Sequence, residues 1–487
     1  MPESSPTYWL TRFCFQRSLG FVYLIAFLIA FNQFRPLVGE QGLLPVPLFL
    51  KRVKFWDAPS LFWLNSTDRC FALAALGGIV LSLMALSGLS DRFGLWFSVA
   101  VWALLWLLYL SFVNVGQTFY GFGWETLLLE TGFLAIFLGS SDISPPQLVI
   151  WLLRWVLFRV MFGAGLIKLR GDACWRDLTC LFYHYETQPL PNPLSWFFHR
   201  LPALAQKGSL LGTHGVELIA PWGVFVPGLI GSVAGALNFI FQISLIVSGN
   251  LSWLNYVTLV LCIPCFDDAF LSRFIPLGIP ETAPISGARQ GILAVLAILI
   301  VLLSVQPTIN LLSPGQIMNT SFEPLHLVNT YGAFGSVTKQ RFEVILEGTN
   351  EAVLTPSTKW KEYEFKGKPG NVARAPCVVS PYHWKLDWQM WFAAMSPYYY
   401  HPWILNLVAK LLQGDQATSK LLALDPFLEE PPRFIRAELY EYQFTDPEEK
   451  RKTGHWWKRT YAREYLPPLS LNDTSFREVL REQGWLK

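Results

Sequence analysis

The segment Trp151–Lys168, WLLRWVLFRVMFGAGLIK, decides the fold class of this chain. A helix that spans a bilayer needs about 20 predominantly apolar residues, and this segment has that character. It nevertheless contains Arg154 and Arg159, and it ends on Lys168. A cation at membrane depth costs several kcal/mol unless it is paired or hydrated. We therefore expect functional residues on this helix and in the polar loop 168–213 that follows it.

The rest of the chain has the composition of a membrane protein with an added water-soluble part. Of its 487 residues, 52% are hydrophobic and 15% are charged, whereas soluble domains carry about 25% charged residues. Residues 1–305 contain 17 of the 38 Lys/Arg and 15 of the 35 Asp/Glu. The shorter segment 306–487 contains the other 21 Lys/Arg and 20 Asp/Glu, so charged residues are denser there. We predict a multi-span transmembrane domain at 1–305 and a soluble domain at 306–487. The net charge of +3 gives no indication of nucleic-acid binding.

The predicted spans follow the apolar runs. These runs fall at about 18–34, 70–89, 93–115, 124–139, 148–168, 214–248, 251–265 and 288–305. The run at 214–248 is too long for one helix and contains Pro221 and Pro227, so it predicts a kinked helix or a hairpin of two. The sequence thus predicts a polytopic α-helical membrane bundle of eight or nine spans. The loop 35–69 predicts an interfacial segment, with Trp56 and Trp63 as anchors.

The soluble part predicts an α+β domain with a β-sheet core. Strand-like patterns occur at Phe342–Leu346, at Tyr363–Phe365 and in RAELYEYQF after Pro426. Helical spacing occurs in LDWQMWFAAM, in PWILNLVAKLLQG, which Gly414 should end, and at 474–483.

Two carboxylates lie in the fourth apolar run, in the segment WETLLLE. We expect Glu125 at the membrane interface and Glu130 about a turn and a half deeper. A lone carboxylate at that depth is costly, so Glu130 should be neutral or paired. Arg159 on the next span is the natural partner. Such a pair can lock two helices together or line a polar cavity.

Lys168 and the loop after it have a structural and a catalytic interpretation. Lys168 can anchor the helix end by reaching the interface, or it can be a desolvated lysine with base character. His184 and Glu186 can form a general acid/base pair or part of a hydrogen-bonded loop core. These three are the candidate catalytic residues. The candidate polar-cavity residues are Glu125, Glu130, Arg159, Asp172, Trp175, Arg176, Asp177, Tyr185 and Gln188.

The cysteines and the absent motifs limit the chemistry. Cys262 and Cys265 form CIPC at the end of an apolar run, where two buried structural thiols are expected rather than a redox motif. Cys174 and Cys180 can pair in an oxidising compartment. The sequence has no ligand spacing of a structural zinc site and no nucleotide-binding or hydrolase motif. We therefore predict no metal and no cofactor.

Three long segments resemble the lipase maturation factor family. They are GFGWETLLLETGFLAIFLG, FRVMFGAGLIKLRGDACWRDLTCLFYHYETQPLPNPLSWFFHRLP and SPYHWKLDWQMWFAAM. The resemblance runs from about Phe21 to Pro468. It implies an endoplasmic reticulum membrane protein, or an inner-membrane protein in a bacterium, that helps secreted homodimeric lipases to fold and assemble. It also implies that the loop 168–213 and the C-terminal domain face the lumen, which favours nine spans.

A maturation factor of this kind needs a surface for its clients. Exposed aromatic side chains suit such a surface, although WQMWF at helical spacing can equally be core. The candidate client-contact residues are Trp384, Asp387, Trp388, Trp391, Phe392 and Tyr399.

A shorter segment, AGLIKLRGDACW, resembles the lysine-bearing segment of the vitamin K-dependent gamma-carboxylases. This resemblance implies that Lys168 acts as a catalytic base, and it supports the alternative of a membrane enzyme with an intramembrane polar cavity. An enzyme predicts that the polar residues converge on a pocket. A chaperone predicts an exposed apolar patch and fully paired polar groups in the bundle.

Overall fold

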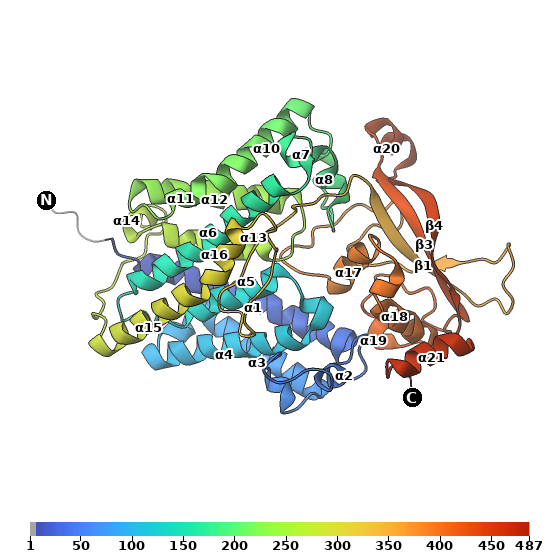
Figure 1. Cartoon of the computed structure of the whole chain (residues 1–487), viewed down its shortest axis with the longest axis horizontal. Helices are drawn as coiled ribbons and strands as arrows, with labels where there is room; N and C mark the ends of the chain where they lie inside the picture. The colour runs from blue at the N-terminus through green and yellow to red at the C-terminus, as the bar shows by residue number, and fades with distance from the viewer. Residues whose placement is uncertain (1–5, 487) are drawn as a thin grey trace.

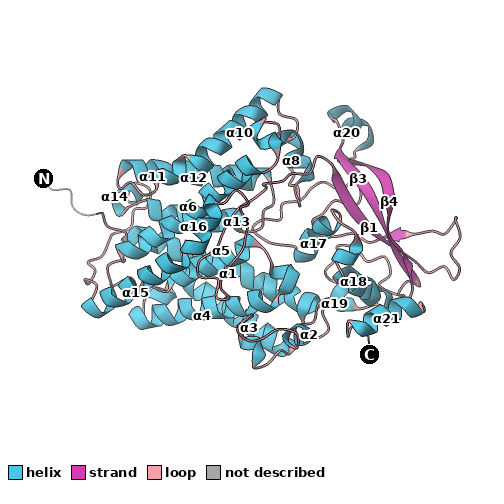
Figure 2. Cartoon of the chain, viewed as in Figure 1, coloured by secondary structure: helices cyan, strands magenta, loops and turns pink. Residues whose placement is uncertain are grey.

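The computed structural model describes residues 6–486, and it joins a helical bundle to a smaller domain that contains a sheet (Figure 1). The sheet lies at one end of the molecule, and helices fill the space between the sheet and the bundle (Figure 2). This arrangement confirms the predicted class, a membrane bundle followed by an α+β domain.

Six helices of the described chain are long and apolar enough to cross a membrane. They are α1 (Trp9–Val38), α3 (Asp68–Ser87), α4 (Leu95–Val115), α6 (Gln147–Arg170), α12 (Leu229–Ser248) and α15 (Gly287–Leu303) continued by α16 (Val305–Leu312). Two predicted spans are instead short helices, α5 (Gly123–Ala135) and α13 (Leu254–Cys262). At 1.5 Å per residue neither reaches across a hydrocarbon core of about 30 Å. The predicted count of eight or nine spans is therefore not confirmed.

The long apolar run at 214–248, for which a kinked helix or a hairpin of two was predicted, is divided among separate helices. Its first residues belong to α10 (Ala203–Leu218), which is followed by α11 (Ala220–Gly223) and then by α12. Pro221 lies in the first turn of α11, and Gly228 adopts a positive φ of 74° directly before α12. Because glycine adopts a positive φ without strain, the chain can change direction here before α12 begins. Short helices in the connecting segments are α2 (Val46–Leu50), α7 (Ala173–Arg176), α8 (Leu181–Thr187), α9 (Ser195–Phe198) and α14 (Asp268–Leu271).

The C-terminal domain is a four-stranded antiparallel sheet with helices on the side that faces the bundle (Figure 2). The strands are β1 (Arg341–Thr349), β2 (Lys361–Glu362), β3 (Phe434–Phe444) and β4 (Trp457–Leu469), in the order β2-β1-β3-β4. The helices are α17 (Lys385–Ala393), α18 (Trp403–Leu412), α19 (Gln416–Ser419), α20 (Pro447–Thr453) and α21 (Thr474–Glu482). The strands at Phe342–Leu346 and in RAELYEYQF, which lie in β1 and β3, and the helices α17, α18 and α21 were predicted, whereas β4 was not. Tyr363–Phe365, predicted as a strand piece, follows β2 directly and forms one β-bridge, between Glu364 and Leu424.

The segment between α16 and β1 lies against the bundle instead of forming a free linker. A Cβ atom on Gly163 of α6 would lie 2.5 Å from the carbonyl oxygen of Tyr331, so only glycine permits this approach. The backbone N–H of Asp172 donates to the carbonyl of Gly335 at 3.0 Å. One continuous apolar core then joins Phe27 of α1 to Leu407 of α18. The two predicted domains therefore share one apolar core.

The two ends of α1 mark the two ends of the bundle. At its start the backbone N–H of Trp9 donates to Asp268 at 2.8 Å. Near its other end the side-chain amide of Gln33 donates to the carbonyl of His383, in the C-terminal domain, at 2.8 Å. The start of α1 and the C-terminal domain thus lie at opposite ends of the bundle (Figure 1).

Candidate functional site

Among the buried ion pairs of residues 6–486, three contain an acidic or basic residue singled out from the sequence. They join Glu130 to Arg159, Glu125 to Lys385, and Lys168 to Glu217. Sequence reasoning predicted only the first of these pairs. Each pair determines what its members can do chemically.

Glu130 and Arg159 form the predicted pair, and both side chains are almost completely buried. The carboxylate also accepts from the hydroxyl of Tyr331 at 2.6 Å and from the backbone N–H and side-chain amide of Asn329 at 3.1 and 3.0 Å. Arg159 donates in addition to the carbonyl of Asn329 at 2.6 Å. The pair is thus enclosed by the segment that follows α16. Its geometry is that of a structural lock, because every carboxylate oxygen already has donors.

Glu125, which was expected at the membrane interface, is completely buried inside the protein. It accepts from the ammonium of Lys385 at 2.7 Å and from the hydroxyl of Tyr109. Lys385 also donates to the carbonyl of Phe119 at 3.1 Å and lies 3.6 Å from the ring centroid of Tyr120. The pair fastens α17 to α5. Sequence spacing gives no sign of it, since its members are 260 residues apart.

His383 lies beside this pair in an aromatic cage. The rings of Phe122, Trp124, Trp253 and Trp388 surround it at centroid distances of 4.9, 5.1, 5.8 and 5.7 Å. Neither ring nitrogen has a hydrogen-bond partner among residues 6–486. Burial, with the charge of Lys385, lowers the pKa of His383 well below its usual value. The imidazole therefore packs as a neutral ring of the core.

Lys168 is buried and paired instead of extending to the interface. Its ammonium lies 2.6 and 2.8 Å from the two carboxylate oxygens of Glu217 on α10, and 5.4 Å from the ring centroid of Trp175. An amine held by both oxygens of one carboxylate is the arrangement of an ion pair. Glu217 was missed because it stands in an apolar stretch that was assigned to a span.

Of the two alternatives for His184 and Glu186, an acid/base pair or part of a loop core, the contacts agree with the second. The ring of His184 lies edge-on to Phe334 at 5.1 Å. Burial, and secondarily the charge of Lys168, lowers the pKa of His184 to about 4. Glu186 accepts from the backbone N–H of Phe444 at 2.6 Å, and burial raises its pKa. Each residue thus belongs to a different contact between the loop and the C-terminal domain.

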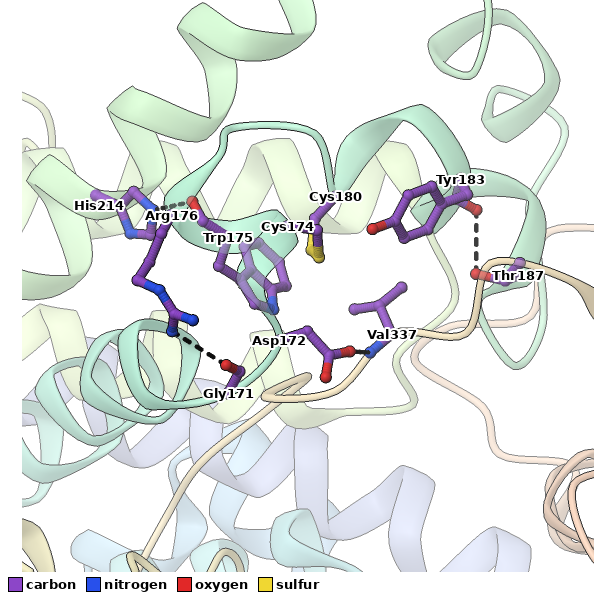
Figure 3. Close-up of a disulfide and its surroundings, with 10 residues drawn as sticks. All are labelled: Gly171, Asp172, Cys174, Trp175, Arg176, Cys180, Tyr183, Thr187, His214 and Val337. Carbon is purple, nitrogen blue, oxygen red and sulfur yellow. Dashed lines mark hydrogen bonds between the residues drawn. A yellow bond between two sulfur atoms is a disulfide. The ribbon is translucent and has the colours of Figure 1, made fainter. Parts of the chain in front are cut away.

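The remaining loop residues form a small core closed by a disulfide between Cys174 and Cys180 (Figure 3). Trp175 and Tyr185 pack in the same apolar cluster. Asp172 accepts from the backbone N–H of Val337 at 2.8 Å, and Arg176 donates to the carbonyls of Leu169 and Gly171. The side-chain amide of Gln188 donates to Ser195 at 2.8 Å, and Asp177 is exposed. Cys262 and Cys265 are buried thiols, as predicted.

Replacing Cys174 and Cys180 together by Ser should destabilise this loop measurably. The bridge closes a short ring, with a sequence separation of 6. The chain-entropy relation gives about 2 kcal/mol for such a ring. The double variant should therefore melt below the wild type, and a reducing agent should lower the melting temperature of the wild type alone. Equal melting of both proteins under oxidising conditions would contradict this contribution.

Buried histidines outside the spans should make the protein less stable in mild acid. Burial lowers the pKa of His184, His199 and His326 to about 4. As the pH falls below about 6.5, the unfolded state takes up these protons before the folded state does. The stability that they contribute is complete above that pH and declines toward pH 4, with about 2 kcal/mol per histidine lost at pH 5. Thermal unfolding between pH 7.5 and 5 measures this loss. His184→Phe should reduce it, and an unaltered pH dependence in that variant contradicts the assignment.

The polar residues named from the sequence do not line the open pocket of about 730 Å³ that residues of the loop after α1 and the start of α3 form.

The predicted client-contact residues differ in exposure. Trp388 and Asp387 are buried, and Asp387 accepts from the backbone N–H groups of Gly367 and Lys368. Trp384, Trp391 and Phe392 are half-buried, and the indole of Trp391 donates to the carbonyl of Thr187 at 3.1 Å. Tyr399 is 63% exposed, beside the equally exposed Tyr400. Most of WQMWF is therefore core, and the accessible aromatics follow α17.

Comparisons with known proteins cover both parts of the chain. A family model described as the lipase maturation factor transmembrane domain matches residues 10–273, and one described as the lipase maturation factor C-terminal domain matches residues 327–467. Lipase maturation factor 1 of Bos taurus is 44% identical over 96% of this chain and 90% of its own length. Lipase maturation factor 1 of Homo sapiens is 42% identical over 99% of this chain and 93% of its own length. Lipase maturation factor 2 of Homo sapiens is 30% identical over 98% of this chain and 85% of its own length. No solved structure matches.

Proposed function

Because the chain belongs to the lipase maturation factor family, we propose that it is a chaperone-like membrane protein that assists the folding and assembly of secreted homodimeric lipases. In a eukaryotic cell its place is the endoplasmic reticulum membrane, and in a bacterium it is the inner membrane. Lipases are its clients and membrane lipid surrounds its helices.

The pairing of the polar groups supports a binding role over catalysis. Lys168, Glu130 and Glu125 each have a charged partner and further hydrogen bonds. An enzyme of the carboxylase type needs Lys168 to be available as a base in a pocket. The comparisons give that alternative no support.

The exposed aromatic patch after α17 is the proposed client contact. Met395, Tyr399 and Tyr400 are 46%, 63% and 69% exposed. Adaptable methionine and large amphipathic tyrosines suit contacts with varied apolar surfaces. Of the predicted contact residues, Tyr399 remains in this surface, whereas Trp391 and Phe392 are half-buried and contact each other at 4.9 Å.

We further propose that the C-terminal domain and loop 168–213 face the lumen, with the start of α1 in the cytoplasm. The start of α1 and the C-terminal domain lie at opposite ends of the bundle, which supports this orientation. This orientation requires an odd number of membrane crossings. Because the long apolar helices of the described chain are six, shorter helices must contribute further crossings.

Client secretion tests the patch directly. Active lipase secreted from cells that lack their own maturation factor is the measurement, with the amount of each variant determined in parallel. Tyr399→Asp combined with Tyr400→Asp should lower rescue at least about tenfold, as expected when contacts worth a few kcal/mol are lost. The matched control is Tyr461→Asp, which changes a 56% exposed tyrosine on β4. Equal rescue by both proteins refutes the patch as the contact.

A second experiment distinguishes a structural role of Lys168 from a catalytic one. Lys168→Met should reduce the amount of folded protein, because it leaves Glu217 buried without its partner. The double variant Lys168→Met/Glu217→Leu removes both charges and should recover folding and client rescue together. If it folds but cannot support secretion, Lys168 has a chemical role and the non-enzymatic proposal fails.

A further inference from the structure

A cavity of about 730 Å³ beside the start of α3 has no role in the contacts described so far. Its rim is polar and includes Glu40 and Arg69, and its wall is apolar and includes Phe62, Leu73 and Ala74. Ligand pockets in proteins typically measure about 300–1,000 Å³. The cavity therefore has the size and the two-part lining that an amphiphile requires.

The cavity lies at the end of the bundle that carries the C-terminal domain. The side-chain amide of Asn406 on α18 donates to the carbonyl of Leu43, which fixes the loop after α1 next to that domain. From the cavity wall, an apolar stripe continues along α3 through the exposed side chains of Leu76 and Val80. Because α3 is a candidate span, this stripe faces lipid. The cavity thus opens at once to the membrane and to its polar surface.

The neighbouring loop supplies aromatic residues of the kind found at headgroup level. Phe55 and Trp56 are both exposed, and their rings meet edge-on at 5.3 Å. The ring of Phe55 also contacts Trp63 at 6.1 Å. Tryptophan is enriched where a membrane meets water, since its ring is apolar and its N–H is polar. This cluster places the rim of the cavity at the depth of the lipid headgroups.

The rim presents one cation and one anion that are available to a ligand. The Arg69 side chain has no ion pair or hydrogen bond within residues 6–486, and it is exposed. Two reciprocal hydrogen bonds between Glu40 and Asp68 hold Glu40 in place. Its backbone N–H donates to the Asp68 carboxylate at 2.9 Å, and its Oε2 accepts from the Asp68 backbone N–H at 2.8 Å. Its Oε1 has no donor in the described chain.

We propose that this cavity binds one zwitterionic glycerophospholipid of the phosphatidylethanolamine type. Its phosphate binds the guanidinium of Arg69, whose planar donors match phosphate oxygens. Its ammonium donates to the open oxygen of Glu40, and an acyl chain lies along Leu73 and Ala74. An anionic lipid would leave Glu40 without a cation, and a choline headgroup has no N–H to donate.

Photolabelling of the full-length protein in nanodiscs tests this site. The probe is a phosphatidylethanolamine with a diazirine in its acyl chain, and labelled peptides are mapped by mass spectrometry. Label should appear in residues 61–74, and Arg69→Ala should reduce it about tenfold, the usual effect of losing a charge-assisted contact. The matched control is Arg92→Ala, an exposed arginine beyond the other end of α3. Glu40→Gln keeps an acceptor for Asp68 and should abolish the preference over a phosphatidylglycerol probe.

Three outcomes overturn the proposal. Equal labelling of the Arg69→Ala and Arg92→Ala proteins indicates ordinary boundary lipid. Equal competition by phosphatidylethanolamine and phosphatidylglycerol removes the role of Glu40. Competition by soluble phosphorylethanolamine assigns the rim to a free phosphate ester instead of a lipid. If Arg69→Ala does not fold, Leu73→Trp gives a second test, because it fills the wall and should exclude the probe while leaving the rim intact.

Discussion

Replacing Lys385 by Met should release the C-terminal domain from the bundle. The Lys385 ammonium is fully buried at 2.7 Å from Glu125, so the variant leaves an uncompensated carboxylate inside the core. Breaking a buried ion pair from one side costs about 3–5 kcal/mol. We expect a clear decrease in melting temperature and proteolysis of the C-terminal domain under conditions that leave the wild type intact.

Two variants show whether this effect comes from the buried charge. Lys385→Met/Glu125→Gln removes both charges and retains an acceptor for the Tyr109 hydroxyl, so it should recover much of the loss. Lys452→Met breaks an exposed pair on α20, with both side chains 70% exposed, and should have little effect. A Lys385→Met protein as stable as the Lys452→Met protein would show that the pair does not hold the domains together.

Replacing Arg159 by Met should destabilise the bundle by a similar amount. The variant leaves Glu130 charged and 1% exposed, and the carbonyl of Asn329 loses its donor. The expected cost is again about 3–5 kcal/mol. Because the same cluster holds Asn329 and Tyr331, hydrogen exchange should increase in residues 326–335 before it increases elsewhere. Thermal unfolding and peptide-resolved exchange measure the two effects.

The control for this prediction is Arg17→Met at the opposite end of the bundle. Arg17 is 21% exposed and lies 3.4 Å from Asp91. Because the Asp91 side chain is only 4% exposed, this variant also leaves a buried carboxylate without its partner and should lower stability, but it should leave exchange in residues 326–335 unchanged. The double variant Arg159→Met/Glu130→Gln should recover part of the loss, since the amide oxygen still accepts from Tyr331. If exchange rises uniformly in the Arg159→Met protein, the cluster does not act as the local lock of this segment.

The family assignment and the fold class were both accessible from the sequence. The segment around Lys168 predicted a helix at membrane depth with cations in it, and the uneven charge distribution predicted a bundle followed by a soluble domain. The Glu130–Arg159 pair was also predictable, because a buried carboxylate on one span needs a cation on the next. These inferences succeed because solvation penalties and helix periodicity act locally along the chain.

The tertiary structure decided what the chemical groups do. Lys168 is paired by Glu217, 49 residues later, and Glu125 by Lys385, 260 residues later. Hydropathy cannot distinguish a short buried helix such as α5 from a complete span, since both are apolar. The sequence pattern of the aromatic segment WQMWF likewise does not distinguish a core helix from a contact surface. Only the tertiary structure shows that Trp388 is buried. The physical reason is common to these cases: burial and pairing depend on residues that are distant in sequence, and they set the charge, the accessibility and hence the role of each side chain.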